Sequence, residues 1–123
     1  MGLGWCCFRN YAAHAEEIGG DISEEYPRFF LKPASAHVEA DENGNNVIEL
    51  MNEEDHIDHE AELVVRLGDD LRPEAMCIGC DTTNRTRQTI AKNKRWPWTE
   101  GKAFRGSGVL GTWTQYQLSL IHI

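Results

Sequence analysis

The segment at residues 60–67 constrains the fold most, because polar and apolar residues alternate there and lead into a run of branched apolar residues. This pattern predicts a β-strand that ends at Gly68. Side chains two residues apart on a strand share a face, so Glu60 and Glu62 are expected to point the same way. Two neighbouring carboxylates repel each other unless a cation lies between them. The first functional hypothesis is therefore a hard divalent cation bound through oxygen.

A third oxygen ligand has to come from elsewhere in the chain. Asp81 is the best candidate, because it ends an apolar segment and begins a polar one, where a rigid element can present a functional side chain. Three carboxylates favour magnesium, manganese or calcium over zinc, which prefers nitrogen and sulfur. Spacing alone leaves an alternative open, since a half-exposed strand also alternates polar and apolar residues.

The composition sets the class of protein. A chain of 123 residues with 41% hydrophobic residues suits one compact domain, and a net charge of −8 argues against nucleic acid as a partner. No apolar run is long enough to span a bilayer, and no secretory signal opens the chain. We therefore expect a cytoplasmic protein that has no membrane partner and keeps its cysteines reduced: Cys6, Cys7, Cys77 and Cys80.

The other segments predict short strands and few helices. Strands are expected over residues 4–8, 27–33, 47–50 and 76–80, and helices over 12–18 and 86–92. Turn residues occupy 41–46, and residues 96–104 look irregular. The expected fold class is mostly β or α+β with a mixed sheet. Residues 118–123 look like a translated sequencing adapter, so we expect a domain over 1–117 followed by a non-native tail.

Two constellations have an ordinary structural alternative. Cys77 and Cys80 have zinc-knuckle spacing, but buried structural cysteines are the favoured interpretation, because adjacent Cys6 and Cys7 make a poor second pair. His14 and Glu17 are three residues apart in the expected first helix. They are either a catalytic base with its orienting carboxylate or a surface pair, and residue spacing alone favours the surface pair.

The remaining candidates are single residues. His56 and His59 flank the acidic strand, but no His-Glu-x-x-His pattern is present, so we interpret them as solvated residues or neighbours of the ligands. Lys32, Arg85 and Lys102 look like isolated cations. Each is either a site for a substrate carboxylate or an ordinary surface charge.

Taken together, the motifs resemble the fumarylacetoacetate hydrolase family. Five blocks in order carry the likeness: Arg-Asn-Tyr-Ala-Ala-His at 9–14, Phe-Leu-Lys-Pro at 30–33, Asp-His-Glu-Ala-Glu-Leu at 58–63, Asp-Thr-Thr-Asn-Arg-Thr-Arg-Gln at 81–88 and Trp-Thr-Glu-Gly-Lys-Ala-Phe at 98–104. The likeness covers most of residues 4–113. The short N-terminal lead resembles small single-domain members that act as acylpyruvate hydrolases or oxaloacetate decarboxylases.

The resemblance implies a rolled mixed β-sheet, a homodimer, and Mg²⁺ or Mn²⁺ held by Glu60, Glu62 and Asp81. It also implies a hydrolase or lyase that cleaves or decarboxylates short anionic 2-oxo acids through a metal-stabilised enolate. The residues it assigns are His14 oriented by Glu17 to activate water, Lys102 for developing negative charge, Arg85 and Gln88 to position the substrate, and Lys32 as a weaker candidate for positioning.

Other outcomes stay open within this resemblance. An isomerase or decarboxylase of hydroxymuconate-type intermediates from aromatic degradation would use the same metal and enolate. A third outcome is a catalytically incompetent fragment. The sequence departs from the family pattern at Phe8, where a glycine is common, and at Arg105, where an aspartate is common. A later Gly-Thr-Pro turn has no counterpart before Ile123, so the chain is expected to lack the C-terminal part of the domain.

Overall fold

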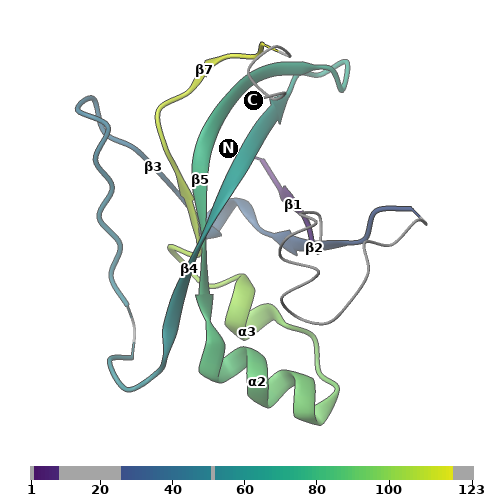
Figure 1. Cartoon of the computed structure of the whole chain (residues 1–123), viewed down its shortest axis with the longest axis vertical. Helices are drawn as coiled ribbons and strands as arrows, with labels where there is room; N and C mark the ends of the chain where they lie inside the picture. Colours follow the sequence, from purple (N-terminus) through teal and green to yellow (C-terminus); the bar gives the residue numbers. More distant parts are fainter. Residues whose placement is uncertain (1, 9–25, 51, 118–123) are drawn as a thin grey trace.

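The computed structural model describes residues 2–8, 26–50 and 52–117. Its most extended element is a long antiparallel β-hairpin (Figure 1). Its strands are β4 (Ile57–Leu67) and β5 (Pro73–Asn84). Residues 58, 60, 62 and 64 of β4 are half-buried, and residues 59, 61, 63 and 65 are exposed. The strand predicted over 60–67 is therefore confirmed and begins at Ile57. The strand expected over 76–80 is confirmed but extends over all of β5.

The hairpin belongs to a mixed sheet with the strand order β3-β6-β5-β4. Strand β3 (His37–Glu39) runs parallel to β6 (Gly108–Leu110), whereas β5 is antiparallel to both β4 and β6. A short strand, β7 (Thr114–Gln115), pairs with the beginning of β5. This arrangement confirms the expected fold class, a β-rich mixed sheet.

A separate two-stranded sheet lies beside the hairpin (Figure 1). It consists of β1 (Gly4–Cys7) and β2 (Phe29–Lys32), which pair in antiparallel fashion. Both strands were expected from their apolar centres. The short 3₁₀ turn η1 (Ala34–Ala36) then leads the chain from β2 into β3.

Within the described residues, two α-helices follow β5 and lie together at one end of the hairpin (Figure 1). Helix α2 (Arg85–Lys94) begins where β5 ends, and the Asn84 side chain caps it by accepting the Arg87 N–H at 3.0 Å. The helix predicted over 86–92 is confirmed. The prediction of irregular structure over 96–104 is wrong in part, because α3 (Thr99–Lys102) forms a single helical turn there.

Close packing of α3 on α2 explains this difference. A Cβ atom added to Gly101 would lie 2.9 Å from the backbone nitrogen of Gln88 and 3.0 Å from its Cα. Only glycine permits the two helices to approach this closely. One turn of helix has little stability alone, so tertiary contact rather than helix propensity determines it.

The strand expected over residues 47–50 is wrong. The structure has no strand there, and Val47 is 84% exposed. The preceding turn is confirmed: Asp41 Oδ1 accepts the N–H groups of Asn43 and Asn45, and Gly44 has a φ of +80°. The turn does not close a hairpin, because β3 pairs with β6 instead. Strand propensity without a neighbouring strand does not produce a ladder.

Two expectations fall on residues that the structure does not describe. The helix over 12–18, with His14 and Glu17, lies outside the described residues, and so does the segment 118–123. Among the described helices, none has the length and apolar character needed to cross a membrane.

The buried side chains are unusual in kind. The buried apolar residues are three alanines, two sulfur-containing residues and one leucine: Ala36, Ala75, Ala91, Met76, Cys77 and Leu110. An equally prominent group is polar or charged, and it includes Lys32, Asp81, Thr83, Gln88 and Lys102. Lysine and aspartate are almost never buried unless they are paired. The polar group therefore marks the candidate functional site.

Candidate active site

Three charged side chains of the candidate site are almost fully enclosed. Lys32 on β2 is 2% exposed, Lys102 at the end of α3 is 4% exposed, and Asp81 on β5 is 7% exposed. The interpretation of Lys32 and Lys102 as ordinary surface charges is therefore wrong. Segments far apart in the sequence meet here, which hydrophobic patterning alone does not indicate.

The hairpin register places the acidic residues on one face. Glu60 and Asp81 are direct cross-strand partners, so their side chains project from the same side of the ladder. Glu62 follows two residues later on this face, opposite Gly79. A Cβ atom on Gly79 would lie 2.6 Å from Val64 Cγ2. Glycine at this position lets β4 lie close to β5 beside the acidic residues.

Lys102 bridges the two facing carboxylates. Its Nζ donates to Glu60 Oε2 at 2.9 Å and to Asp81 Oδ2 at 2.7 Å. A third hydrogen bond of 2.6 Å goes to Thr83 Oγ1. On the other side of Asp81, Lys32 Nζ lies 2.9 Å from Oδ1 and also donates to the backbone carbonyl of Lys102. Two lysines thus enclose one aspartate.

Arg85, the first residue of α2, holds the other oxygen of Glu60. Its Nη2 donates to Glu60 Oε1 at 2.7 Å, and its Nε donates to Asp58 Oδ2 at 2.8 Å. The remaining Nη1 donates to Gln88 Oε1 at 2.7 Å. A single guanidinium plane therefore joins two carboxylates of β4 to α2, a geometry that lysine does not offer. Arg85 stands alone in the sequence, but in the structure it is only partly exposed and pairs with both carboxylates.

The pKa shifts follow from burial and from these partners. Burial alone would raise the pKa of Glu60, but the hydrogen bonds from Lys102 and Arg85 outweigh it and hold the pKa below its ordinary value. Burial lowers the pKa of Lys32, and the neighbouring Asp81 opposes this effect. On β1, burial raises the pKa of the Cys6 thiol to about 11, while the charge of Lys32 acts to lower it. The charges of the site thus act electrostatically on Cys6 in β1.

The donor set suits a hard divalent cation in its chemistry. Glu60, Glu62 and Asp81 offer carboxylate oxygens only, which magnesium and manganese prefer. Asp81 Oδ1 is buried and accepts no hydrogen bond from any described residue, although Lys32 is near. Within residues 2–8, 26–50 and 52–117, no three Asp, Glu, His or Cys side chains lie close enough together to hold a metal ion. In this arrangement the Lys102 ammonium lies between Glu60 and Asp81.

The structure brings most of the predicted site residues together. Six of them form one connected network: Lys32, Glu60, Asp81, Arg85, Gln88 and Lys102. Glu62 shares their face of the hairpin. His14 and Glu17 lie outside the described residues.

Sequence reasoning missed several neighbours of this network. Asp58 and Thr83 each lie two residues from a predicted ligand, so strand periodicity could have found them. Cys6 and Phe30 face the site from the smaller sheet, with the Phe30 ring centroid 5.2 Å from Lys102 Nζ. No local signal predicts their position, because it depends on how β1 and β2 approach β5.

The alternative metal ligands do not come together. Cys77 and Cys80 lie three residues apart on one strand, so they project from opposite faces and do not form a knuckle. Of the cysteines expected to be buried, Cys77 is buried, whereas Cys6, Cys7 and Cys80 are half-buried. His56 and His59 are exposed, and His56 Nε2 lies 2.6 Å from Asp58 Oδ1.

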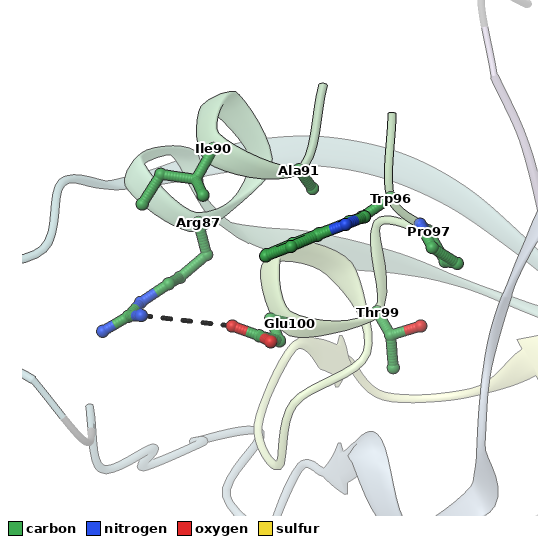
Figure 2. A pocket seen from close by; sticks show the side chains of 7 residues that line it. All are labelled: Arg87, Ile90, Ala91, Trp96, Pro97, Thr99 and Glu100. Atoms are coloured by element: carbon green, nitrogen blue, oxygen red, sulfur yellow. Dashed lines mark ion pairs between the residues drawn. The ribbon is translucent and has the colours of Figure 1, made fainter. Parts of the chain in front are cut away.

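Two surface hollows of the described chain lie away from these residues. Figure 2 shows one of about 260 Å³ lined by Arg87, Ile90, Ala91, Trp96, Pro97, Thr99 and Glu100. Arg87 already contacts Glu100 at 4.0 Å and Asp55 at 3.1 Å. None of the predicted site residues lines this hollow or its larger neighbour beside Leu50 and Phe104. The enclosed charges, rather than these hollows, mark the candidate site.

Known proteins resemble this chain over most of its length. The model of the fumarylacetoacetate (FAA) hydrolase C-terminal family matches residues 4–120. An oxaloacetate decarboxylase, mitochondrial, from Dictyostelium discoideum is 39% identical over 106 residues, which are 78% of this chain and 47% of the relative. Oxaloacetate tautomerase FAHD1, mitochondrial, from Arabidopsis thaliana is 38% identical over 79% of this chain and 46% of the relative.

Solved structures show the same fold. Fumarylpyruvate hydrolase from Pseudomonas aeruginosa, in complex with Mn²⁺ and pyruvate, superposes with a TM-score of 0.74 at 32% identity, over 90% of this chain and 52% of that chain. The structure of 5-carboxymethyl-2-hydroxymuconate delta-isomerase from Mycobacterium smegmatis superposes with a TM-score of 0.68 at 29% identity, over 94% of this chain and 46% of that chain. The chain therefore spans about half the length of the curated relatives it matches.

Proposed function

Because this chain belongs to the fumarylacetoacetate hydrolase family, we propose that its site binds a divalent metal ion and acts on short anionic 2-oxo acids. The single observation that carries the proposal is the enclosed bridge of Lys102 between Glu60 and Asp81. Enclosed charges of this kind stabilise a fold poorly and occur most often where chemistry requires them.

Glu60, Glu62 and Asp81 are the proposed ligands of Mg²⁺ or Mn²⁺. All three project from one face of the hairpin. The Pseudomonas relative binds Mn²⁺ together with pyruvate, which supports both a divalent ion and a 2-oxo acid here. A bound ion of this kind supplies Lewis-acid polarisation of a substrate keto oxygen.

The cations of the network bind and orient the substrate in this proposal. Lys102 stabilises the negative charge that develops on the substrate's enolate oxygen, from a site that is already closed to solvent. Arg85 and Gln88 position the substrate carboxylate, and their mutual hydrogen bond fixes both side chains. Lys32 offsets the charge of Asp81 and remains the weaker candidate for substrate contact.

His14, oriented by Glu17, is the proposed proton carrier. In hydrolysis His14 takes a proton from water, and the hydroxide oxygen adds to the acyl carbonyl carbon. The carbon–carbon bond then breaks, and its electron pair stays with the pyruvate part as an enolate. The enolate carbon that was part of the broken bond finally accepts a proton, which yields pyruvate and the free acid. In decarboxylation carbon dioxide leaves instead, and the same carbon is protonated.

A second candidate function is isomerisation. Relatives with the names oxaloacetate tautomerase and hydroxymuconate delta-isomerase favour it, because their names describe proton shifts without bond cleavage. Such a reaction needs the enolate-stabilising cations and the proton carrier but no attacking water. A homodimer is proposed for either activity.

A panel of substrates tests the proposal. The chain, supplied with Mg²⁺ or Mn²⁺, is given oxaloacetate, acetylpyruvate and fumarylpyruvate, while pyruvate release and enol–keto exchange are followed separately. We expect metal-dependent turnover that is lost in Glu62→Ala and kept in Glu74→Ala, a control on the exposed end of the hairpin. Turnover that continues in the presence of a chelator would refute the proposed requirement for a divalent metal ion. Metal binding without turnover would identify a catalytically incompetent fragment.

A further inference from the structure

The ammonium group of Lys102 lies between Glu60 Oε2 and Asp81 Oδ2, the place that a metal ion bound by these two oxygens would take. We propose that Lys102 is a built-in counter-ion that competes with the divalent metal, so that the ion binds only when Lys102 releases both carboxylates. This inference rests on the metal site proposed above. It concerns the order of events at that site and the residue that controls metal affinity.

Distances show why the ion and the ammonium exclude each other. Lys102 Nζ is 2.9 Å from Glu60 Oε2 and 2.7 Å from Asp81 Oδ2. A divalent ion bound by the same two oxygens would lie about 2.0–2.6 Å from each of them. Both cations would then fill one space, where their positive charges repel strongly because water is excluded.

The balance of charges supports release of one cation. Among the described residues, three cations (Lys32, Arg85 and Lys102) pair with the carboxylates of Asp58, Glu60 and Asp81. Glu62 adds a fourth carboxylate on the same face. A divalent ion adds two positive charges to a group whose carboxylates are already largely neutralised. Arg85 holds the opposite oxygen of Glu60, and Lys32 lies on the opposite oxygen of Asp81. Lys102 is thus the cation whose contacts a shared metal replaces.

Besides the two carboxylates, the Lys102 ammonium has two further contacts that a metal ion would not replace. The Phe30 ring centroid lies 5.2 Å from Nζ, within the range of a cation–π contact, and Thr83 Oγ1 accepts a hydrogen bond. The Lys102 carbonyl is held by Lys32, so the backbone stays in place while the side chain moves. After release the ammonium remains at the site and is available to an anionic substrate.

Direct binding of Mn²⁺ alone tests the inference without any catalytic readout. Lys102→Met removes the charge and keeps an unbranched side chain. We expect Mn²⁺ to bind this variant about tenfold more tightly than the original chain, since removing an adjacent unit charge changes carboxylate affinities by at least this order. Lys94→Met is the matched control. Lys94 is exposed over the Trp96 ring, outside the network, so the same loss of charge there should leave the affinity unchanged.

A second variant and a second measurement guard against a folding defect. Lys102→Gln keeps a polar contact to both carboxylates without the charge, and it should also bind Mn²⁺ more tightly. Both Lys102 variants should gain more in melting temperature from Mn²⁺ than the original chain does, because a ligand stabilises the state that binds it. If the original chain binds Mn²⁺ and both variants bind it equally or more weakly, the inference is overturned and the metal site stands. If none of the three binds Mn²⁺, the proposed metal site is overturned as well.

Discussion

Glu60 and Asp81 face each other across the β4–β5 ladder, and a single ammonium group hydrogen-bonds to both. Their geometry comes from the backbone register of two long strands, which hold side chains more firmly than a loop does. The cations that surround them come from β2, α2 and α3, so the site forms only when these elements pack against the hairpin.

Gly101→Ala should separate α3 from α2. The added Cβ would lie 2.9–3.0 Å from backbone atoms of Gln88, which have no room to yield. We expect a loss of about 1–3 kcal/mol in the free energy of unfolding, typical of overpacking, together with misplacement of Lys102. Urea denaturation measures the first effect. Gly2→Ala is the control, since nothing lies within 4 Å of its added Cβ. A Gly101→Ala chain as stable as the original would refute the helix contact.

Arg85→Lys should weaken the binding of an anionic oxo acid. Lysine retains the charge but cannot contact Asp58, Glu60 and Gln88 at once, as the guanidinium does. We expect KM to rise about tenfold while Mn²⁺ is still bound. Arg105→Lys, on an exposed residue, should change neither quantity. An unchanged KM for Arg85→Lys would remove Arg85 from the substrate site.

Stability should fall in acid because three carboxylates have lowered pKa values in the folded chain. The hydrogen bond from Asn84 lowers the pKa of Asp55, and the hydrogen bond from Arg85 lowers that of Asp58. For Glu60, burial acts to raise the pKa, but its hydrogen bonds prevail and lower it. The unfolded chain therefore binds protons first, from about pH 4.5 for Glu60 and about 3.8 for the aspartates downward.

The stability from these groups is complete above those values and is lost as the pH falls through the lower, folded pKa values. Urea midpoints taken from neutral pH to about pH 3 measure this decline. Asp58→Asn should flatten part of it, because the substituted residue no longer titrates. A stability that stays constant down to pH 3 would contradict the paired carboxylates.

Cys6 should react slowly with alkylating agents. Burial raises the pKa of its thiol to about 11, so only about one thousandth is thiolate near pH 8. We expect labelling by iodoacetamide, followed by mass spectrometry of the Cys6 peptide, to rise about tenfold per pH unit. Labelling in urea provides the reference rate. Equal rates in the folded and unfolded chain would place Cys6 outside the enclosed site.

The sequence predicts the parts of this fold that depend on local pattern. Alternation predicts β4, and the shared face of Glu60 and Glu62 follows from strand periodicity. The strand expected over 47–50 failed, because its branched residues have no neighbouring strand. The helical turn α3 was missed, because its formation depends on the close contact between Gly101 and Gln88.

In the candidate site, too, local pattern predicts some residues and long-range packing determines the others. Asp81 was predicted as a ligand from its place at the end of an apolar segment, and the structure shows it as the cross-strand partner of Glu60. The burial of Lys32 and Lys102 could not be predicted, since it follows from long-range packing of β2 and α3 against β5. Charged residues that appear isolated in a sequence can therefore meet in one network, as Lys32 and Lys102 do at Asp81.

The number of Mn²⁺ ions bound per chain, measured by electron paramagnetic resonance of the free ion, tests the proposed metal site without any intermediate step. We expect one Mn²⁺ site per chain that is lost in Asp81→Asn and retained in Asp70→Asn, a control on an exposed aspartate of the β4–β5 turn. Equal Mn²⁺ binding by the Asp81→Asn variant and the original chain would show that these enclosed carboxylates do not form a metal site.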